Sequence, residues 1–340
     1  MKAILVKKGS GAALADVEIP EISEGEVLVK MKVCGLCGTD IEKIRGEYVA
    51  SMPIVGHEPA GVVAGKGVGV EGLEIGDRVF VHHHVPCGEC FYCKHGSETM
   101  CPSYRSSNIF PGGFAEYFRV PKWNVQHGAI LKLPDGVSFE EGSLIEPLAC
   151  CIRAINRWNI EGSDSVLVVG AGPLGLMHAL LLMIRGIKPI VSDIKPSRLE
   201  MARKLGVSYT LDANNDVEQQ VKSMTDGRGV DYAITASGSI SAMNQALRAI
   251  RKGGKLCLFG VPSKGSVLDY DISEIFNSEI SILTNYGATE KETNEALRLI
   301  ERNGKLFSSI ITHRYSIDEF SKAVEASISG EALKVVIYSS

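Results

Sequence analysis

Hydrophobic and polar residues alternate in short segments along the first third of the chain, which predicts a β-rich unit with many loops. Val27–Val33 is the clearest segment, because every second residue is apolar, as in a half-buried strand. Glycine, proline and aspartate recur between such segments, for example in Ile54–Pro59 and Gly72–Phe80, and are typical of turns. The chain is therefore expected to begin with a mainly β domain.

From about residue 150 the pattern changes to continuous apolar runs that alternate with helix-like stretches. The apolar runs are Ser165–Val169, Pro189–Asp193, Val230–Thr235 and Lys255–Phe259. The helix-like stretches are Leu174–Arg185, Ser197–Leu205 and Ser241–Ile250. Continuous apolar runs are typical of strands that are buried on both faces. The alternation of such strands with helices predicts a parallel, doubly wound sheet.

Beyond about residue 285 the pattern changes again, and the tail is expected to return to the first unit. Glu292–Arg302 is amphipathic, and Ser316–Glu319 has the form of a capping box before a helix that ends near Ser329. Lys334–Tyr338 is typical of a last strand. We therefore predict three segments, 1–148, 149–285 and 286–340, of which the first and third form one domain.

Composition adds expectations about location and partners. The 340 residues are 45% hydrophobic and carry a net charge of −4, which does not favour binding to nucleic acid or to an anionic membrane. The most apolar stretch, Leu174–Ile184, is too short to span a bilayer, and the N-terminus has too short an apolar run for a signal peptide. Nine cysteines, an odd number, argue against a disulfide framework. We expect a cytoplasmic protein.

Four closely spaced cysteines predict a structural zinc site. Their spacing is Cys87-x2-Cys90-x2-Cys93-x7-Cys101. Four thiolates with no open position form a tetrahedral zinc site that stabilises a loop. Two other interpretations stay open, namely buried free cysteines and an iron–sulfur cluster, although the bacterial cluster motif has a shorter last gap.

The segment Gly170-Ala-Gly172-Pro-Leu-Gly175 follows a predicted strand and begins a predicted helix. In a dinucleotide-binding motif the first glycine allows a tight turn, the second lets the backbone approach the pyrophosphate, and the third lets helix and strand pack closely. The helix N-terminus then offers free N–H groups to phosphate oxygens. We assign Gly170, Gly172, Pro173, Leu174 and Gly175 to cofactor binding.

Asp193 ends the next apolar run, where an acidic residue accepts hydrogen bonds from the adenosine ribose. A carboxylate there repels a 2′-phosphate, which predicts NAD rather than NADP. Lys195 and Arg198 lie nearby and could each reach a phosphate, and Arg198 is assigned to the cofactor site. The alternative is that Asp193 is only a solvated residue at a strand–helix turn.

Three further motifs each hold a candidate zinc ligand. They are Cys37-Gly-Thr-Asp40, Gly56-His-Glu58 and Glu146-Pro-Leu148. Together with the cysteine lobe and the glycine motif, in this order over the whole chain, they resemble the zinc-containing medium-chain dehydrogenases. The resemblance is closest to the branch of polyol, sugar and threonine dehydrogenases.

The resemblance implies an α/β two-domain fold, with a GroES-like β-rich catalytic domain at 1–148, a Rossmann NAD-binding domain at 149–285, and 286–340 returning to the catalytic domain. It places the active site in the cleft between the domains. It also implies a small-molecule alcohol substrate and a homodimer or homotetramer that associates through the Rossmann domains near Ser281–Thr284.

The resemblance further implies that Cys37, His57 and Glu146 hold a catalytic zinc, with Glu58 as a ligand or an outer group. The charges of Cys37 and Glu146 neutralise Zn²⁺, and a permanent Glu58 ligand would make the site anionic, which favours water or substrate in the fourth position. Pro147 is expected to hold the backbone of Glu146 extended.

The resemblance and the sequence also give assignments for other residues. Thr39 matches a hydroxyl that carries the substrate proton, the alternative being a hydroxyl that bonds to the local turn. Cys34 is expected to pack in the core. Glu116 resembles a sugar-binding position. The triplet His82–His84 is interpreted as alternating strand residues with a structural role, rather than as metal or substrate ligands.

These features predict a zinc-dependent oxidoreductase with two zinc ions per chain, which transfers hydride between NAD and a secondary alcohol of a polyol or sugar. Asn285-Tyr-Gly287 differs from the F-R-Y segment of sorbitol dehydrogenases, which argues against sorbitol itself. Two alternatives stay open. One is a threonine-type amino-alcohol dehydrogenase, and the other is a zinc-stabilised binding protein without catalytic activity.

Overall fold

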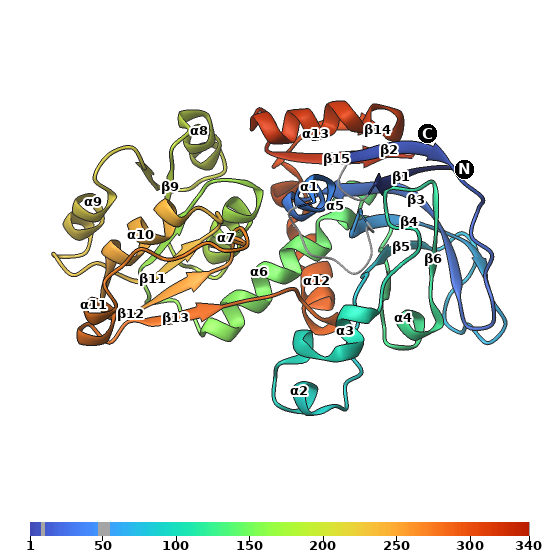
Figure 1. The fold of residues 1–340 in the computed structure, drawn as a ribbon, viewed down its shortest axis with the longest axis horizontal. Coiled ribbons are helices and arrows are strands. Elements are labelled where there is room, and N and C mark those ends of the chain that lie inside the picture. The colour runs from blue at the N-terminus through green and yellow to red at the C-terminus, as the bar shows by residue number, and fades with distance from the viewer. Residues whose placement is uncertain (8–10, 47–54, 340) are drawn as a thin grey trace. The chain divides into compact units, whose positions relative to one another are not determined.

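The computed structural model describes residues 1–7, 11–46 and 55–339. The chain forms two compact units, one made of residues 1–149 and 287–340, the other of residues 150–286 (Figure 1). We call them unit 1 and unit 2. The expected boundaries at 148/149 and 285/286 fall beside these divisions. No helix among the described residues is long and apolar enough to cross a membrane.

Unit 1 is built on two β-sheets. Strands β1 (Lys2–Lys7) and β2 (Gly11–Asp16) form an antiparallel pair. A larger sheet has the order β14-β15-β3-β4-β5-β7, with β6 paired to β3. Its strands are β3 (Val27–Leu36), β4 (Glu58–Lys66), β5 (Arg78–Val81), β6 (Tyr117–Val120), β7 (Ile130–Lys132), β14 (Ile311–Ser316) and β15 (Lys334–Tyr338). The C-terminal strand β15 pairs with β3, so the tail completes unit 1.

Short helices connect these strands and two longer ones pack on them. The helices are α1 (Gly38–Arg45), α2 (Phe91–Lys94), α3 (Pro102–Ser106), α4 (Lys122–Gln126), α5 (Phe139–Ser143), α12 (Glu290–Ser308) and α13 (Phe320–Ser329). A 3-10 turn, Ile317–Glu319, precedes α13 and carries the predicted capping box at Ser316 and Glu319. In β3, residues at every second position are buried, as the alternating pattern predicts.

Unit 2 contains a six-stranded sheet in the order β10-β9-β8-β11-β12-β13, and every neighbouring pair is parallel. The strands are β8 (Val166–Val169), β9 (Ile190–Asp193), β10 (Tyr209–Asp212), β11 (Val230–Thr235), β12 (Ile250–Leu258) and β13 (Ser281–Thr284). This is the doubly wound order: successive strands are added on one side of the first strand, β8, and then on its other side. The predicted parallel sheet is confirmed.

Five helices accompany this sheet: α7 (Pro173–Ile184), α8 (Pro196–Lys204), α9 (Val217–Met224), α10 (Ile240–Ala249) and α11 (Ile272–Asn277). Val221 of α9 and Leu247 of α10 pack with Leu167 of β8 in one hydrophobic core. Helix α6 (Ile145–Trp158) carries the chain from unit 1 into unit 2.

Two local expectations are wrong. His82–His84 are not strand residues, because β5 ends at Val81 and the triplet continues as a loop. Glu146 is not extended but lies in the first turn of α6. Pro147 is tolerated there because the first N–H groups of a helix have no partner within the helix, so the missing donor is not needed.

Candidate functional site

The sheet of unit 1 positions Cys37 through the junction of β3 and α1. Cys37 is the N-cap of α1, and its backbone N–H donates to Oδ2 of Asp40 at 3.1 Å. Asp40 is completely buried, and its Oδ1 also accepts from the backbone N–H of Gly56 at 2.9 Å. Asp40 therefore ties the Cys37 segment to the segment that carries His57.

The ring of His57 is oriented by the same carboxylate. Its Nδ1 lies 3.2 Å from Oδ1 of Asp40, so Nδ1 carries the proton and Nε2 is left for a metal ion. Burial lowers the pKa of His57, but the charges of Asp40 and Cys37 raise it by more, to well above its usual value. A metal ion at this ring would therefore displace a proton when it binds.

Glu58 begins β4 and forms a buried ion pair with Lys334 of β15. Oε2 of Glu58 lies 2.5 Å from Nζ of Lys334, and the two residues are 0% and 3% exposed. Burial is the main cause that raises the pKa of Glu58, although Lys334 opposes it. The other oxygen, Oε1, is buried and has no hydrogen-bond partner among the described residues.

Ligand atoms of Cys37, His57 and Glu58 all lie within 4.8 Å of one another. A thiolate, an imidazole and a carboxylate are the ligands that Zn²⁺ prefers. The lone Oε1 atom of Glu58 fits a bound cation, because buried polar atoms are rarely left without a partner. Lys334 also changes the expected charge balance, since its ammonium offsets the carboxylate that was expected to make the site anionic. We call these three residues the Cys37 cluster.

Glu146 belongs to a neighbouring group. Its carboxylate lies with His82 and His83, and ligand atoms of these three residues are within 4.8 Å of one another. We call them the His82 cluster. The two clusters are close, since the ring centroids of His57 and His83 are 5.2 Å apart. Burial, aided by the surrounding imidazoles, lowers the pKa of His83 well below its usual value, so this ring is neutral.

Thr39, Cys34 and Glu116 are the other residues of unit 1 to which the sequence assigned a role. Thr39 lies in the first turn of α1, two residues after Cys37, and is half-buried. Cys34 is completely buried in the core of unit 1. Oε2 of Glu116 accepts from the backbone N–H of Lys2 at 2.7 Å, so its carboxylate joins β1 to the segment before β6. Glu116 belongs to none of the metal-binding groups found among the described residues.

The four lobe cysteines surround one point. Their Sγ atoms lie within 4.8 Å of one another, for example 3.5 Å from Cys90 to Cys93 and 3.6 Å from Cys101 to Cys87. Burial raises the pKa of Cys101. Backbone N–H donors, led by that of Cys87, lower it by more, so the pKa falls to about 6. Such N–H···S bonds favour the thiolate, which is the form that binds zinc.

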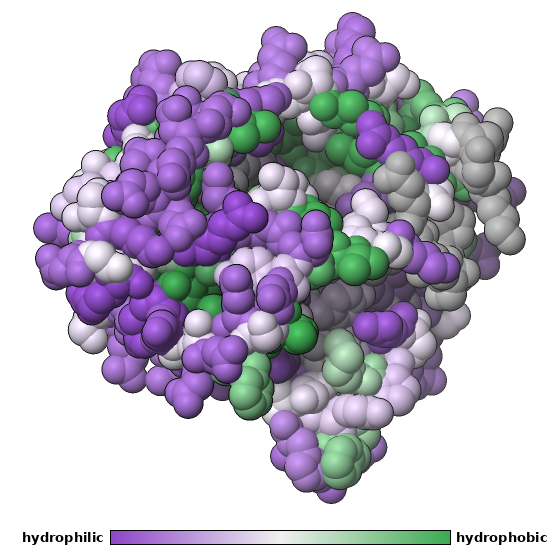
Figure 2. Space-filling model, turned by 60° about the vertical axis from the view of Figure 1, so that its left-hand side comes forward, coloured by the Kyte–Doolittle hydropathy of each residue, from purple (hydrophilic) through white to green (hydrophobic). Residues whose placement is uncertain are grey.

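The lobe forms a protrusion of unit 1 at the lower edge of Figure 2, where hydrophobic and hydrophilic residues lie side by side. It contains α2 and α3, and none of its helices exceeds five residues. Phe91 is 70% exposed. So small an apolar interior cannot hold the lobe together alone, which fits a structural metal site.

In unit 2 the glycine motif lies between β8 and α7. Gly170 follows β8 with φ = 101°, and Gly172 is the N-cap of α7 with Pro173 at the first helical position. A Cβ atom at Gly175 would lie 1.8 Å from the carbonyl oxygen of Gly170, so only glycine allows this helix–strand contact. At Gly172 a Cβ would meet no atom within 4 Å.

A cavity of about 360 Å³ opens at Gly170 and Gly172 and is lined also by Pro173, Asp193 and Arg198. Asp193 is held by the backbone, because Oδ2 accepts from Ala171 N–H at 2.7 Å and Oδ1 from Lys195 N–H at 2.8 Å. Nη1 of Arg198 lies 3.7 Å from Asp193. The structure thus brings together Gly170, Gly172, Pro173, Asp193 and Arg198 of the predicted cofactor residues. Leu174 and Gly175 do not line the cavity, and the carbonyl of Leu174 faces His178 at 2.9 Å.

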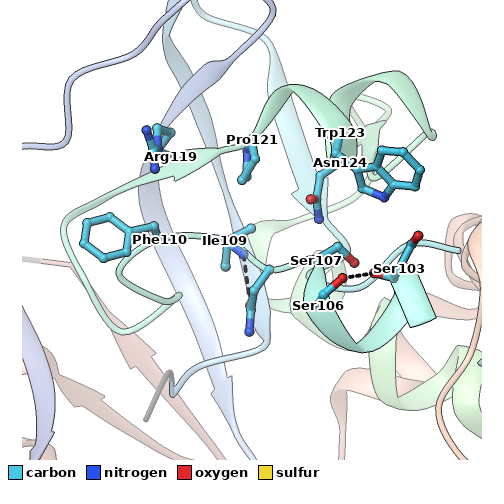
Figure 3. A pocket seen from close by; sticks show the side chains of 10 residues that line it. Ser103, Ser106, Ser107, Ile109, Phe110, Arg119, Pro121, Trp123 and Asn124 are labelled. Carbon is cyan, nitrogen blue, oxygen red and sulfur yellow. Dashed lines mark hydrogen bonds between the residues drawn. The ribbon is translucent and has the colours of Figure 1, made fainter. Parts of the chain in front are cut away.

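Another pocket in unit 1, of about 440 Å³, contains none of the predicted site residues. Figure 3 shows Phe110 and Arg119 at one side of it and Trp123 and Asn124 at the other. Asn124 is completely buried, and its Nδ2 donates to the carbonyl oxygen of His83 at 2.9 Å. This pocket therefore borders the loop that carries the His82 cluster.

Sequence reasoning did not identify the contacts of Asp40 and Lys334 or the proximity of His82 and His83 to Glu146. Asp40 ends the Cys37-Gly-Thr-Asp40 motif, and this position beside a candidate metal ligand could have indicated a role in the site. Lys334 gave little signal, because a lysine at the start of an apolar strand is usually exposed.

Comparison with known proteins gives matches over most of the chain. The family of alcohol dehydrogenase GroES-like domains matches residues 23–135, and the family of zinc-binding dehydrogenases matches residues 173–302. The chain is 32% identical to sorbitol dehydrogenase of Bacillus subtilis (strain 168), covering 99% of this chain and 97% of that protein. It is 37% identical to L-threonine 3-dehydrogenase of Pyrococcus abyssi, covering 97% and 96%.

Among solved structures, the chain resembles an alcohol dehydrogenase from Escherichia coli CFT073 in complex with NADH. The TM-score is 0.85 with 27% sequence identity, and the match covers 99% of each chain. Both units are therefore present in these relatives, in the same order along the chain.

Proposed function

The chain belongs to the family of zinc-containing medium-chain alcohol and polyol dehydrogenases, and we propose that it oxidises a secondary alcohol of a polyol or sugar with NAD. It is a zinc-dependent, nicotinamide-linked dehydrogenase. The substrate class, the coenzyme preference and the ligand roles of single residues are proposals.

The arrangement of the Cys37 cluster carries the proposal. Thiolate, imidazole and carboxylate converge within 4.8 Å, and a buried Glu58 oxygen there has no partner among the described residues. Three protein ligands leave one tetrahedral position for an alcohol oxygen, as in catalytic zinc sites. When bound, zinc acts as a Lewis acid on that oxygen, and NAD accepts the hydride.

The residues around this cluster have separate roles in the proposal. Asp40 fixes the orientation of His57, and Lys334 balances the charge of Glu58. Thr39 is the proposed first carrier of the substrate proton, since it follows Cys37 in the same helical turn. We propose unit 1 as the catalytic domain and unit 2 as the NAD-binding domain. We further propose a zinc ion in the cysteine lobe.

Coenzyme preference is proposed from the cavity of unit 2. The Asp193 carboxylate is buried and lies at the glycine motif, where it accepts ribose hydroxyls and repels a 2′-phosphate. Arg198 lines the same cavity but is paired with that carboxylate, so it is less available to a phosphate. Comparable kcat/KM values with NAD and NADP would contradict this preference.

Location and assembly also stay proposals. All nine cysteines are free thiols in the structure, which supports a reducing compartment such as the cytoplasm. Association of two or four chains through the edge strand β13 is proposed because β13 ends the sheet of unit 2.

A threonine-type amino-alcohol dehydrogenase is the second candidate. The match to the L-threonine 3-dehydrogenase of Pyrococcus abyssi has a higher identity than the match to the sorbitol dehydrogenase of Bacillus subtilis, 37% against 32%. Both reactions oxidise a secondary alcohol and use the same metal and coenzyme chemistry, so the substrate must be tested directly.

The test is NAD reduction by the purified protein with a panel of polyols, aldoses, L-threonine and simple alcohols. We expect the highest kcat/KM with a polyol or sugar, and no turnover in Cys37→Ser. Cys150→Ser, which changes a thiol outside the three metal-binding groups, is the matched control. A preference for L-threonine would replace the first proposal by the second, and full activity of Cys37→Ser would refute both.

A further inference from the structure

The cofactor cavity of unit 2 extends beyond the residues assigned to the pyrophosphate and the ribose. Gly170 and Gly172 line it where α7 begins, and Asp193 lines it at the end of β9. The lining continues to Ala213, which follows β10, and to Gln245 of α10. The pyrophosphate is expected at the start of α7 and the ribose at Asp193. The part of the cavity at Ala213 and Gln245 is therefore left for the base of the dinucleotide.

The walls of this part of the cavity suit a flat ring. Ala213 and Ala242 line it with side chains of a single methyl group. Ile194, the residue after Asp193, also lines the cavity and is 62% exposed although it is apolar. A planar base that packs against Ile194 removes this apolar surface from water, which is favourable.

Gln245 brings an amide to the same part of the cavity, and a backbone contact fixes its orientation. Its Nε2 donates to the carbonyl oxygen of Ala213 at 3.1 Å. A carbonyl oxygen can only accept, so Nε2 and not Oε1 must face Ala213. The described residues make no other hydrogen bond with this amide. One N–H donor and the acceptor Oε1 of Gln245 are therefore left for a ligand.

We propose that Gln245 recognises the adenine of the coenzyme by paired hydrogen bonds along one edge of the base. Oε1 accepts from the 6-amino group, and the remaining N–H donates to a neighbouring ring nitrogen, which is the pairing by which glutamine reads adenine. A base with an oxygen at position 6 presents an acceptor to Oε1 and is disfavoured. The inference rests on the proposed NAD coenzyme but concerns the base alone.

The probe is nicotinamide hypoxanthine dinucleotide, in which an oxygen replaces the 6-amino group of adenine. Its reduced form differs from NADH at the base alone, and binding of both to the full-length protein is followed by dihydronicotinamide fluorescence. We expect the wild type to bind NADH about 5- to 30-fold more tightly than the analogue. This is the lower part of the range for a paired contact, because Gln245 is only half-buried.

Gln245→Leu should bring the ratio of the two Kd values close to one, because it removes both hydrogen-bonding groups. Gln220→Leu is the matched control and should keep the wild-type ratio. Gln220 is also half-buried, and its Nε2 donates to the carbonyl oxygen of Asp216 at 3.2 Å, but it lies on α9 and does not line the cavity. A glutamine that only holds α10 against Ala213 would change both Kd values by the same factor and leave their ratio unchanged.

Two results would overturn the proposal and leave the coenzyme assignment intact. One is equal Kd values for NADH and the analogue in the wild type, and the other is a preference for NADH that persists in Gln245→Leu. If circular dichroism shows that Gln245→Leu does not fold, Gln245→Met takes its place, since methionine is also unbranched.

Failure of the proposed coenzyme is a separate result. If the wild type binds NADPH and not NADH, the same comparison is made with NADPH and its hypoxanthine analogue, because the base is the same in both coenzymes. A wild type that binds neither coenzyme refutes the proposed coenzyme and this inference with it.

Discussion

At the scale of single residues, the charge of the Cys37 cluster depends on one buried ammonium group. Glu58 and Lys334 are both buried and form a close ion pair, and removal of one partner from such a pair leaves an uncompensated charge. The pair keeps Oε2 of Glu58 occupied and leaves Oε1 without a partner among the described residues. A carboxylate oxygen of Glu58 also lies within 4.8 Å of the ligand atoms of Cys37 and His57. A single carboxylate can thus anchor the β4–β15 region and serve as a metal ligand.

Glu58→Gln should therefore release metal from the Cys37 cluster, because the amide is a poor ligand and leaves Lys334 unpaired. We expect metal affinity to fall by more than the roughly 10- to 100-fold typical of losing an outer hydrogen-bond partner. Cobalt exchanged into this cluster and followed by its thiolate band under mild chelation measures the loss. Glu146→Gln is the comparison, and loss of that band in Glu146→Gln but not in Glu58→Gln would make Glu146 the ligand instead.

The two glycines at the start of α7 predict a contrast between stability and cofactor binding. Gly172→Ala should keep the melting temperature, because its Cβ meets no atom within 4 Å, but should weaken NADH binding by blocking the backbone from the pyrophosphate. Gly175→Ala should lower both, since its Cβ would lie 1.8 Å from Gly170 O, an overlap that costs about 1–3 kcal/mol. Thermal melts with NADH titrations test this, and normal NADH binding by Gly172→Ala would contradict it.

A site residue can be predicted from the sequence when its partners lie close to it along the chain. The lobe cysteines and Gly170, Gly172 and Gly175 are close in sequence, so spacing alone predicts their geometry. Lys334 reaches Glu58 from 276 positions away, and no local pattern reports such a contact. Glu146 was assigned an extended backbone from Pro147, but that preference gives way where proline falls in the first turn of a helix.

At the scale of elements, the lobe is a loop whose structure depends on its thiols. Cys87→Ser should lower the metal content by one ion per chain and make the lobe sensitive to protease, because its short helices have little apolar interior. The thiolate band of the Cys37 cluster should be unchanged. Elemental analysis and limited proteolysis measure both effects, with Cys150→Ser as the control. An intact, protease-resistant lobe in Cys87→Ser would show that the thiols are merely buried cysteines.

Strands β8, β11 and β12 are joined near one end by the carboxylate of Asp231. Oδ2 accepts from the backbone N–H of Ser165 at 2.8 Å and from its hydroxyl at 2.6 Å, and Oδ1 accepts from Nε of Arg251 at 2.6 Å. Burial raises the pKa of Asp231, but these donors lower it by more, so the net pKa is below its usual value. The carboxylate therefore stabilises the sheet only while it is ionised.

Because the folded pKa is depressed, this stabilisation is fully present above the unfolded value of about 3.9 and is lost as the pH falls through the folded pKa. Asp231→Asn should weaken the sheet by about 1–3 kcal/mol at neutral pH, and the difference should shrink below about pH 4. Hydrogen exchange of β8 and β11 amides measures this locally. The exposed Asp226→Asn is the control, and a difference that does not change with pH would contradict the assignment.

Element types followed from the sequence wherever one periodicity ran without interruption. β11 has the predicted bounds, and α7, α8 and α10 differ from them by a residue at each end. β12 begins at Ile250, earlier than predicted, because Ile250 already pairs with Val230 of β11. Arg251–Gly254 interrupt both the apolar pattern and the pairing with β11, which resumes at Lys255. The His82–His84 loop looked like a strand because it directly continues the apolar residues of β5.

At the scale of the whole molecule, the chain forms unit 1 from both of its ends and unit 2 from its middle. Strand β15 pairs with β3, and β15 also supplies Lys334 to Glu58, so the last residues complete the environment of the Cys37 cluster. The order of segments was predictable because the helix–strand alternation stops near residue 285. The pairing partner of β15 was not, since long-range strand pairing leaves no local pattern in a single sequence.

Self-association is the last prediction. β13 is at the edge of the unit 2 sheet and pairs only with β12 among the described strands, while Ile282 on it is 41% exposed. An exposed apolar edge favours pairing with another strand, and a second β13 offers the same unpaired N–H and C=O groups. We expect a homodimer or homotetramer in light scattering at micromolar concentration.

Ile282→Lys should weaken this association at least tenfold, about 1.4 kcal/mol, because two lysines would meet where two edges pair. Val68→Lys is the matched control, since Val68 is 83% exposed in unit 1 and lies outside the sheet of unit 2. Sedimentation of both variants over a concentration series distinguishes the cases. A wild-type monomer would refute association, whereas a dimer that Ile282→Lys leaves intact would place the interface on another surface.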